Sequence, residues 1–260
     1  MPNGCLWAAV FLATAAMNLA SATTCVKPHL ALLALLLAAG CTTLAPQATA
    51  PDAQAWHAVG LPGKAATQYQ PARKDGRWAI EARSERSASM WRRKLQRAPG
   101  QFGHVHFSWW VQDVIAEASV ADASREDAPA RVMFGFDGDH ADLPPRTRLM
   151  FDMAEALTGE RPPYATLMYV WDAKAPVGTV IINPRSDRIR KIVVDSGEAQ
   201  LRRWREHRRD LAADFRLAFG EAPGALQSVA LMTDSDNTRS AARSWYGGVT
   251  LHPAAGSRAP

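Results

Sequence analysis

Two adjacent carboxylates and a nearby guanidinium are the first groups in this chain whose spacing could support chemistry. Glu126 and Asp127 precede Arg131, while Asp137 and Asp139 follow the same apolar stretch. Glycoside hydrolysis needs two carboxyl groups that face each other across a cleft. Carboxylates at opposite ends of one strand do not easily converge, so we expect ion pairing instead. Asp127 and Arg131 are the first pair to test, and both are candidate ligand-binding residues.

A second group of oxygen-bearing side chains lies near the end of the chain, at Asp234, Asp236, Asn237 and Thr238. The order D-x-D-x-T also occurs in a phosphatase nucleophile motif, but that motif opens a large α/β domain and only 22 residues follow Thr238 here. An EF-hand calcium loop would need glycine and glutamate where this chain has Arg239 and Trp245. A looser calcium site with carboxylates from other loops stays open. We favour a structural turn in which these side chains cap backbone groups.

Aromatic and imidazole side chains supply the remaining candidates. Trp109, Trp110 and Trp171 are candidate ligand-binding residues, because an exposed indole presents an apolar face to a sugar ring. Core packing is the more common fate of any one tryptophan. His104 and His106 share one strand face at a spacing that some zinc sites use. The sequence offers no identifiable third ligand, so we favour a hydrogen-bonded or exposed pair over a metal site.

The composition is that of one ordinary globular domain. The 260 residues are 47% hydrophobic, 8% aromatic and 21% charged. A formal net charge of +5, spread over both signs, is weak support for a nucleic-acid partner. All three cysteines fall at Cys5, Cys25 and Cys41. Disulfides, cysteine nucleophiles and cysteine-rich zinc sites are therefore excluded from the rest of the chain.

The N-terminal part reads as a targeting segment. Residues 30–40 form an apolar run that is too short to span a bilayer. The order Leu-Ala-Ala-Gly before Cys41 resembles the lipobox of bacterial lipoproteins, which implies lipidation at Cys41. We expect a signal segment at 1–40, with Val26 as an alternative start, and a lipidated tether at 41–54. An ordinary signal peptide stays open. Thr42, where lipoproteins kept in the inner membrane carry aspartate, favours the outer membrane.

Alternation of apolar and polar residues predicts a mainly β body at 55–252, with a short tail at 253–260. The strongest strand is 104–114, which places Val105, Phe107, Trp109 and Val111 on one core face. Further strands are expected at 56–60, 78–83, 87–91, 131–137, 164–171, 177–182, 191–195, 228–232 and 245–251. We expect 78–83 and 87–91 to form a hairpin, and 228–232 and 245–251 to form the closing strand pair.

Two segments break the β pattern. Residues 146–158 predict a short amphipathic helix, with a stripe made of Leu149, Met150, Met153 and Leu157. Residues 198–219 predict a longer helix whose apolar stripe is Leu201, Trp204, Leu211, Phe215 and Phe219. Five arginines would then form its solvated face, namely Arg202, Arg203, Arg205, Arg208 and Arg209. Strands interrupted by two helices, without regular alternation, argue for an antiparallel β-sandwich.

Several segments occur in an order that we recognise. They are ASMW, FSWWVQ, EDAPARVMFGFD, PYATLMYVW, WREHRRDLAADFRLAFG and ALMTDSDNTRSAARSWYGGVTL. In these segments, which cover most of 55–251, the chain resembles an uncharacterised bacterial envelope family, domain of unknown function three-zero-four-seven. The resemblance implies a jelly roll of the galactose-binding-like type, which is similar to carbohydrate-binding modules.

The leading hypothesis is a periplasmic lipoprotein, tethered to the outer membrane, that binds a saccharide or envelope glycan without catalysis. One alternative is a hydrolase on envelope polysaccharide that uses Asp127 and a second carboxylate. Another is an assembly or scaffold lipoprotein with a protein partner. Two carboxyl groups about 5–10 Å apart in a cleft would favour the hydrolase, and an exposed apolar patch would favour the scaffold. We expect no cofactor, apart from the calcium ion left open above.

Overall fold

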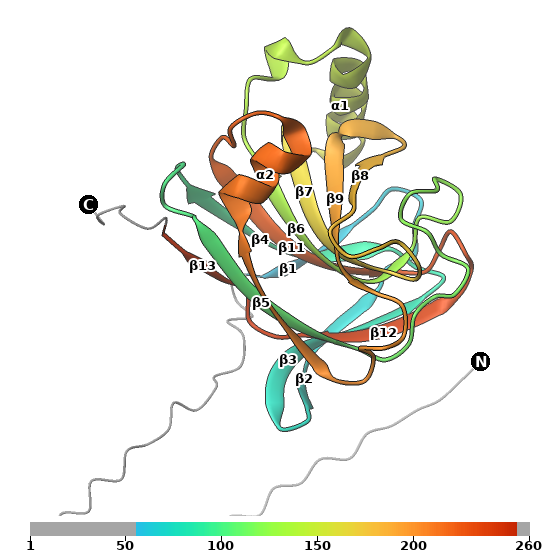
Figure 1. Cartoon of the computed structure of the whole chain (residues 1–260). Coiled ribbons are helices and arrows are strands. Elements are labelled where there is room, and N and C mark those ends of the chain that lie inside the picture. Colours follow the sequence, from blue (N-terminus) through green and yellow to red (C-terminus); the bar gives the residue numbers. More distant parts are fainter. Residues whose placement is uncertain (1–55, 254–260) are drawn as a thin grey trace, which may run out of the picture. The chain divides into compact units, whose positions relative to one another are not determined.

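The computed structural model describes residues 56–253 (Figure 1). All strands and helices of this part lie between His57 and His252. A fragment of residues 55–260 therefore carries every strand pairing and both α-helices. The predicted signal segment, Val26, Cys41 with its tether, and the tail beyond Pro253 lie outside the described residues. No helix in residues 56–253 is both long enough and apolar enough to cross a bilayer.

The larger sheet has seven strands in the order β1-β4-β11-β6-β7-β9-β8. They are β1 (His57–Gly60), β4 (Ser89–Arg97), β6 (Ala128–Phe136), β7 (Ala165–Asp172), β8 (Val180–Asn183), β9 (Ser186–Ser196) and β11 (Leu226–Asp234). Neighbouring strands run antiparallel except β7 and β9, which run parallel. The β8 strand lies between them in sequence and pairs with β9 as the edge of the sheet.

The smaller sheet has the order β10-β5-β12-β3-β2, with β13 paired to β5. Its strands are β2 (Gln68–Lys74), β3 (Arg77–Glu85), β5 (His104–Val111), β10 (Trp204–Asp210), β12 (Ala241–Tyr246) and β13 (Thr250–His252). The two sheets face each other across the core (Figure 1). This confirms the predicted mainly β sandwich with two α-helices.

The core lies between the sheets and follows the alternation of β5. Val105, Phe107, Trp109 and Val111 are all buried in the main core cluster, as their spacing predicted. Phe107 stacks on Tyr169 of β7 with 5.4 Å between ring centroids. Because successive side chains of a strand point to opposite faces, Trp110 lies in a separate cluster on the outer face, with Trp245.

The first predicted helix is present as α1 (Pro145–Thr158) and ends at Gly159, whose φ of 73° suits a residue without a side chain. Its apolar stripe points away from the sandwich. Leu149, Met150, Met153 and Leu157 are 60%, 38%, 56% and 72% exposed. Thr147 and Phe151 are the helix residues that are buried. Figure 1 shows α1 at one end of the molecule, beyond the strands.

The second helix is much shorter than predicted, because 204–210 form the strand β10 and only α2 (Leu211–Phe219) is helical. Asp210 caps α2 by accepting a hydrogen bond from Ala213 N at 2.9 Å, and Gly220 ends it as expected. The five arginines thus share no helix face. Two of them reach buried carboxylates, since Arg205 Nε donates to Asp195 at 3.0 Å and Arg209 Nε to Asp214 at 2.8 Å. These ion pairs neutralise two of the charges on β10, so that a segment rich in arginine can form a strand.

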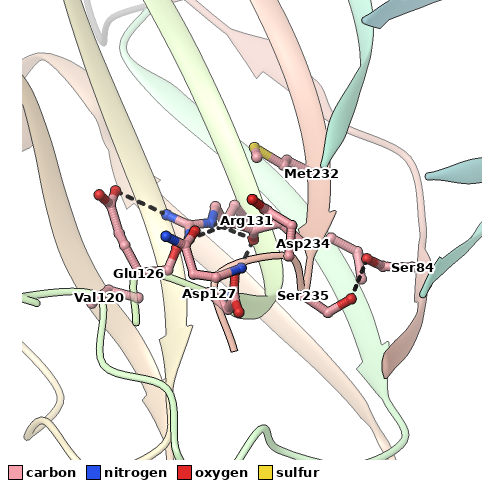
Figure 2. Close-up of polar contacts among 12 residues, drawn as sticks. Ser84, Val120, Glu126, Asp127, Arg131, Met232, Asp234 and Ser235 are labelled. Atoms are coloured by element: carbon pink, nitrogen blue, oxygen red, sulfur yellow. Dashed lines mark hydrogen bonds and ion pairs between the residues drawn. The ribbon is translucent and has the colours of Figure 1, made fainter. Parts of the chain in front are cut away.

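Both predicted strand pairs are wrong in their partners. β3 pairs with β2 and β12, whereas β4 pairs with β1 and β11 in the other sheet. Likewise β11 and β12 belong to different sheets. The chain crosses between sheets at corners closed by buried hydroxyl groups, including Ser84 Oγ and Ser235 Oγ at 2.7 Å (Figure 2). Such crossings leave no signature in strand periodicity.

Candidate functional site

A buried charged cluster brings together the carboxylates that stand far apart in the sequence (Figure 2). We define it as Glu126, Asp127, Arg131, Lys191 and Asp234, all of which are buried. β11 and β6 are neighbours, with Asp234 opposite Ala128 and Met232 opposite Arg131. Arg131 and Asp234 therefore lie on the outer face of the larger sheet, where the segment that carries Glu126 and Asp127 covers them.

The central ion pair joins Arg131 to Asp234. Nε and Nη2 of Arg131 each lie 2.9 Å from one oxygen of Asp234, which is a bidentate arrangement. Nη2 also donates to the backbone oxygen of Glu126 at 2.7 Å. The sequence predicted Asp127 as the partner of Arg131. Both residues are in the cluster, but the hydrogen-bonded carboxylate is Asp234.

Asp127 closes the turn that follows β11. Its oxygens accept hydrogen bonds from the backbone N of Asn237 at 3.2 Å, and from N and Oγ1 of Thr238 at 2.7 and 2.6 Å. Asp234 accepts from Ala128 N at 3.1 Å, and Asp236 forms an ion pair with Lys64. The expected turn is present, but the carboxylate that caps it comes from a distant segment.

Lys191 is the member of the cluster that the sequence analysis missed. Its ammonium lies 2.6 Å from Oε1 of Glu126 and donates to the backbone oxygen of Val120. Glu126 is also bound by Asn183 Nδ2 and Arg185 Nη1, each at 2.6 Å. Within the segment KIVVD, a lysine looks like the polar start of a strand. Only the packing of residues 120–126 over the sheet buries it.

Burial dominates the electrostatics of the cluster. It raises the pKa of Asp234 to about 6, and the positive charge of Arg131 offsets this only in part. Burial lowers the pKa of Lys191 to about 8, with Arg131 acting in the same direction and Glu126 opposing. The close ion pairs of the cluster therefore offset only part of the hydration that Asp234 and Lys191 lose on burial.

The pKa of Lys191 predicts a pH dependence of stability. Because the folded pKa of about 8 lies below the ordinary 10.5, the stabilising contribution is present above pH 10.5 and is lost as the pH falls through about 8. Relative to Lys191→Met, we expect the free energy of unfolding of the wild type to rise by about 2–3 kcal/mol between about pH 7 and about pH 10. Urea unfolding of both proteins across this range measures the difference. Parallel pH profiles would show that Lys191 is not buried as a charged group.

Two residues of the cluster, together with Asp236, form the one group with metal-like spacing among residues 56–253. Ligand oxygens of Asp127, Asp234 and Asp236 lie within 4.8 Å of one another. Both oxygens of Asp127 and of Asp234 already accept hydrogen bonds, and Asp236 faces Lys64. A calcium ion would have to displace Arg131 from Asp234, so this donor set fits an internal ion-pair network better than the calcium site left open by the sequence.

The candidate tryptophans are not brought to a binding surface. Trp109 and Trp171 are 0% exposed, and their indole nitrogens donate to Asp195 at 2.8 Å and to the Gly197 oxygen at 3.0 Å. Trp110 is 7% exposed beneath the ammonium of Lys74, which lies 3.7 Å from the ring centroid. The structure therefore supports the core-packing alternative, because none of the three presents a free ring face.

A groove lies between β4 and β13 with the residues that flank β13. Its volume is about 630 Å³, and we call it the β4–β13 groove, lined by Arg93, Leu95, Arg97, Gln101, Val249, Thr250, Leu251 and Pro253. Nε of Arg93 is buried and has no hydrogen-bond partner among the described residues. The lining combines apolar side chains with N–H donors and contains no carboxylate. Nothing in the sequence pattern had marked these residues.

A smaller groove of about 250 Å³ lies between β4 and the segment after α1. Its charged lining residues are Arg92, Lys94, Glu160 and Arg161. Glu160 is its one acidic residue, and its carboxylate binds Arg92 at 2.7 Å and Lys94 at 3.1 Å. Neither groove therefore holds the two facing carboxyl groups that hydrolysis of a glycoside requires.

Comparison with known sequences supports the family resemblance. A family profile described as "Protein of unknown function (DUF3047)" matches residues 54–250. This range covers almost all of the described sandwich. No curated protein sequence shows a significant match to the chain.

Solved structures that resemble the chain include a carbohydrate-binding module and a xyloglucanase domain. The family 11 carbohydrate-binding module from Clostridium thermocellum, in complex with a mixed-linked tetrasaccharide, has 9% identity and a TM-score of 0.39, and the match covers 77% of this chain and 89% of that one. The xyloglucanase domain of NopAA from Sinorhizobium fredii has 8% identity and a TM-score of 0.40, with 76% and 93% covered. Values this low transfer neither a ligand nor an activity to this chain.

Proposed function

We propose that the chain, which belongs to the DUF3047 family, whose description assigns no function, is a non-catalytic module that binds a saccharide of the cell envelope. The observation that carries this proposal is the β4–β13 groove. Its volume of about 630 Å³ lies within the range of about 300–1,000 Å³ that is usual for ligand sites.

The lining of the groove indicates the chemistry of the ligand. Arg93 and Arg97 offer guanidinium donors, and Gln101 offers an amide. Leu95, Val249 and Leu251 form apolar surface beside them. A sugar ring has apolar C–H faces and hydroxyl edges, and arginine binds carboxylate and phosphate groups in a planar manner. We therefore propose an acidic saccharide as the ligand class.

Hydrolysis is the less favoured alternative because of where the carboxylates lie. Asp127 and Asp234 are 1% and 3% exposed. Both are held by hydrogen bonds within the protein, and neither lines the groove. A buried carboxylate without access to substrate cannot protonate a glycosidic oxygen.

A saccharide array tests the binding function directly. The fragment of residues 55–260 should bind acidic saccharides and leave their neutral analogues unbound. The same saccharides, incubated with the protein, should release no reducing ends. Binding to none of the arrayed saccharides would contradict the proposal, and release of reducing ends would instead support the hydrolase.

We also propose that Cys41 is lipidated and tethers the module to the periplasmic face of the outer membrane. The support is the lipobox-like order before Cys41 and the Ala/Thr/Pro-rich residues after it. A palmitate analogue should label the full chain in cells and should not label Cys41→Ala. Equal labelling of both proteins would contradict lipidation at Cys41.

A further inference from the structure

The exposed stripe of α1 is the largest group of apolar side chains that the described residues leave uncovered. Leu149, Met153 and Leu157 follow one another every four residues, and Met150 lies beside them. At 100° per residue, Phe151 lies about 145° from the centre of this stripe and Thr147 lies about 105° from it. These two buried residues hold the helix on the protein, and the exposure of the four apolar side chains shows that the stripe faces outward.

The charges around the stripe are uneven. Asp152 lies on one flank of the stripe and Glu155 on the opposite face of the helix. Both form ion pairs with Arg161, with 2.8 Å between Arg161 Nε and Glu155. Arg146 and Arg148 at the start of the helix are exposed and form no ion pair within the described residues. Arg146, one turn before Leu149 and Met150, therefore places a positive charge on a long, flexible side chain at the N-terminal end of the stripe.

The distance between α1 and the start of the domain determines whether the helix can reach a bilayer to which the chain is anchored. His57 of β1 lies opposite Arg92 in strand register. Arg92 binds Glu160 at 2.7 Å, two residues after the end of α1. The chain therefore enters the domain on the side where α1 ends. Residues 42–55 span at most about 45–50 Å when extended, so a lipid at Cys41 would keep α1 within reach of the bilayer.

We propose that α1 is a membrane-contacting helix that lies in the lipid–water interface with Leu149, Met150, Met153 and Leu157 among the acyl chains. Its location at a bilayer rests on the proposed anchoring, but its affinity for lipid does not. An apolar face about 100° wide, with an arginine at its N-terminal end and no acidic side chain within it, is the pattern of an interfacial helix.

Vesicle flotation tests this contact without the anchor. The fragment of residues 55–260 contains no cysteine, so lipidation cannot affect the result. The wild-type fragment should float with vesicles of phosphatidylethanolamine and phosphatidylglycerol. The triple variant Leu149→Ser, Met153→Ser, Leu157→Ser should lose at least about tenfold of the bound fraction, because each substitution removes apolar contact with lipid. Leu217→Ser, at the exposed position of α2, is the matched control and should float like the wild type.

Thermal melting of the triple variant should match that of the wild type, because the substituted side chains are exposed. Wild-type protein that stays at the bottom of the gradient would overturn the proposal, and so would a triple variant that floats equally well. A wild-type dimer in light scattering that the triple variant abolishes would assign the stripe to a second copy of the chain. Failure of Cys41 labelling would leave the flotation result intact, so the two proposals can fail separately.

Discussion

Asp234→Asn is expected to lower the free energy of unfolding by about 3–5 kcal/mol, because it leaves the buried guanidinium of Arg131 without its negative partner. Asp234 binds Arg131 through both oxygens at 2.9 Å, and Arg131 is 2% exposed. An asparagine keeps one acceptor oxygen but turns an amide NH₂ group toward the guanidinium. Urea unfolding at neutral pH measures the loss.

The matched control is Asp236→Asn, two residues along the same turn. Asp236 pairs with Lys64, whose side chain is 42% exposed, so its loss should cost at most about 1 kcal/mol. Adding Arg131→Met to Asp234→Asn should recover part of the loss, since the unpaired charge is removed with it. Wild-type melting should not change with a chelator. A chelator-sensitive wild type would show that these carboxylates bind a metal ion. Equal losses for Asp234→Asn and Asp236→Asn would contradict the dominant role of the ion pair between Arg131 and Asp234.

The second large effect is expected at Phe215 on α2. Its ring is 1% exposed and lies 4.6 Å from the ring centroid of Phe136 and 4.5 Å from that of Phe219. Phe215→Ala should cost about 3–5 kcal/mol through lost burial and the cavity that remains. Thermal or urea unfolding measures the change.

Leu217→Ala on the same helix is the control for Phe215. Leu217 is 65% exposed, so its truncation should change stability by about 0.5 kcal/mol or less. Trp204, which the sequence placed on the same buried helix stripe, is partly exposed on β10, and its truncation should cost less than that of Phe215. If Phe215→Ala and Leu217→Ala unfold alike, α2 does not dock against the core as described.

The sequence was most informative where one residue pattern had a single structural explanation. In β5, strict alternation identified four core residues, because one face of the strand is turned toward the opposite sheet. At α1 and α2, Gly159 and Gly220 marked the helix ends, since both take a left-handed conformation at φ 73° and 76°. These signals depend only on neighbouring residues, so they can be interpreted without knowing which strands or helices pack together.

Long-range pairing could not be predicted in this way. The spacing of Leu201, Trp204, Leu211 and Phe215 fits a helical stripe, and nothing local shows that Asp195 and Asp214 would satisfy Arg205 and Arg209 from outside the strand. Similarly, the turn at Ser84 to Arg86 has the length of a hairpin but crosses between sheets. Both errors arise because tertiary contacts override local preference.

For the site, the residue types were identified better than the partners. Asp127, Arg131, Asp234 and the turn after it do meet in one cluster, although more than a hundred residues separate its two halves. Lys191 was missed because burial of a lysine depends on a loop that covers it. The β4–β13 groove was missed because its lining comes from two segments with no shared motif.

The most direct test of the binding proposal is the effect of a groove arginine on saccharide binding. Arg97 is exposed and lines the β4–β13 groove, whereas Arg146 is exposed on α1, so each substitution by alanine removes one positive charge. On the same saccharide array, Arg97→Ala should reduce binding of acidic saccharides by about tenfold or more, as for a lost charged hydrogen bond, and Arg146→Ala should leave it unchanged. Equal signals from both variants would contradict a saccharide site in the β4–β13 groove.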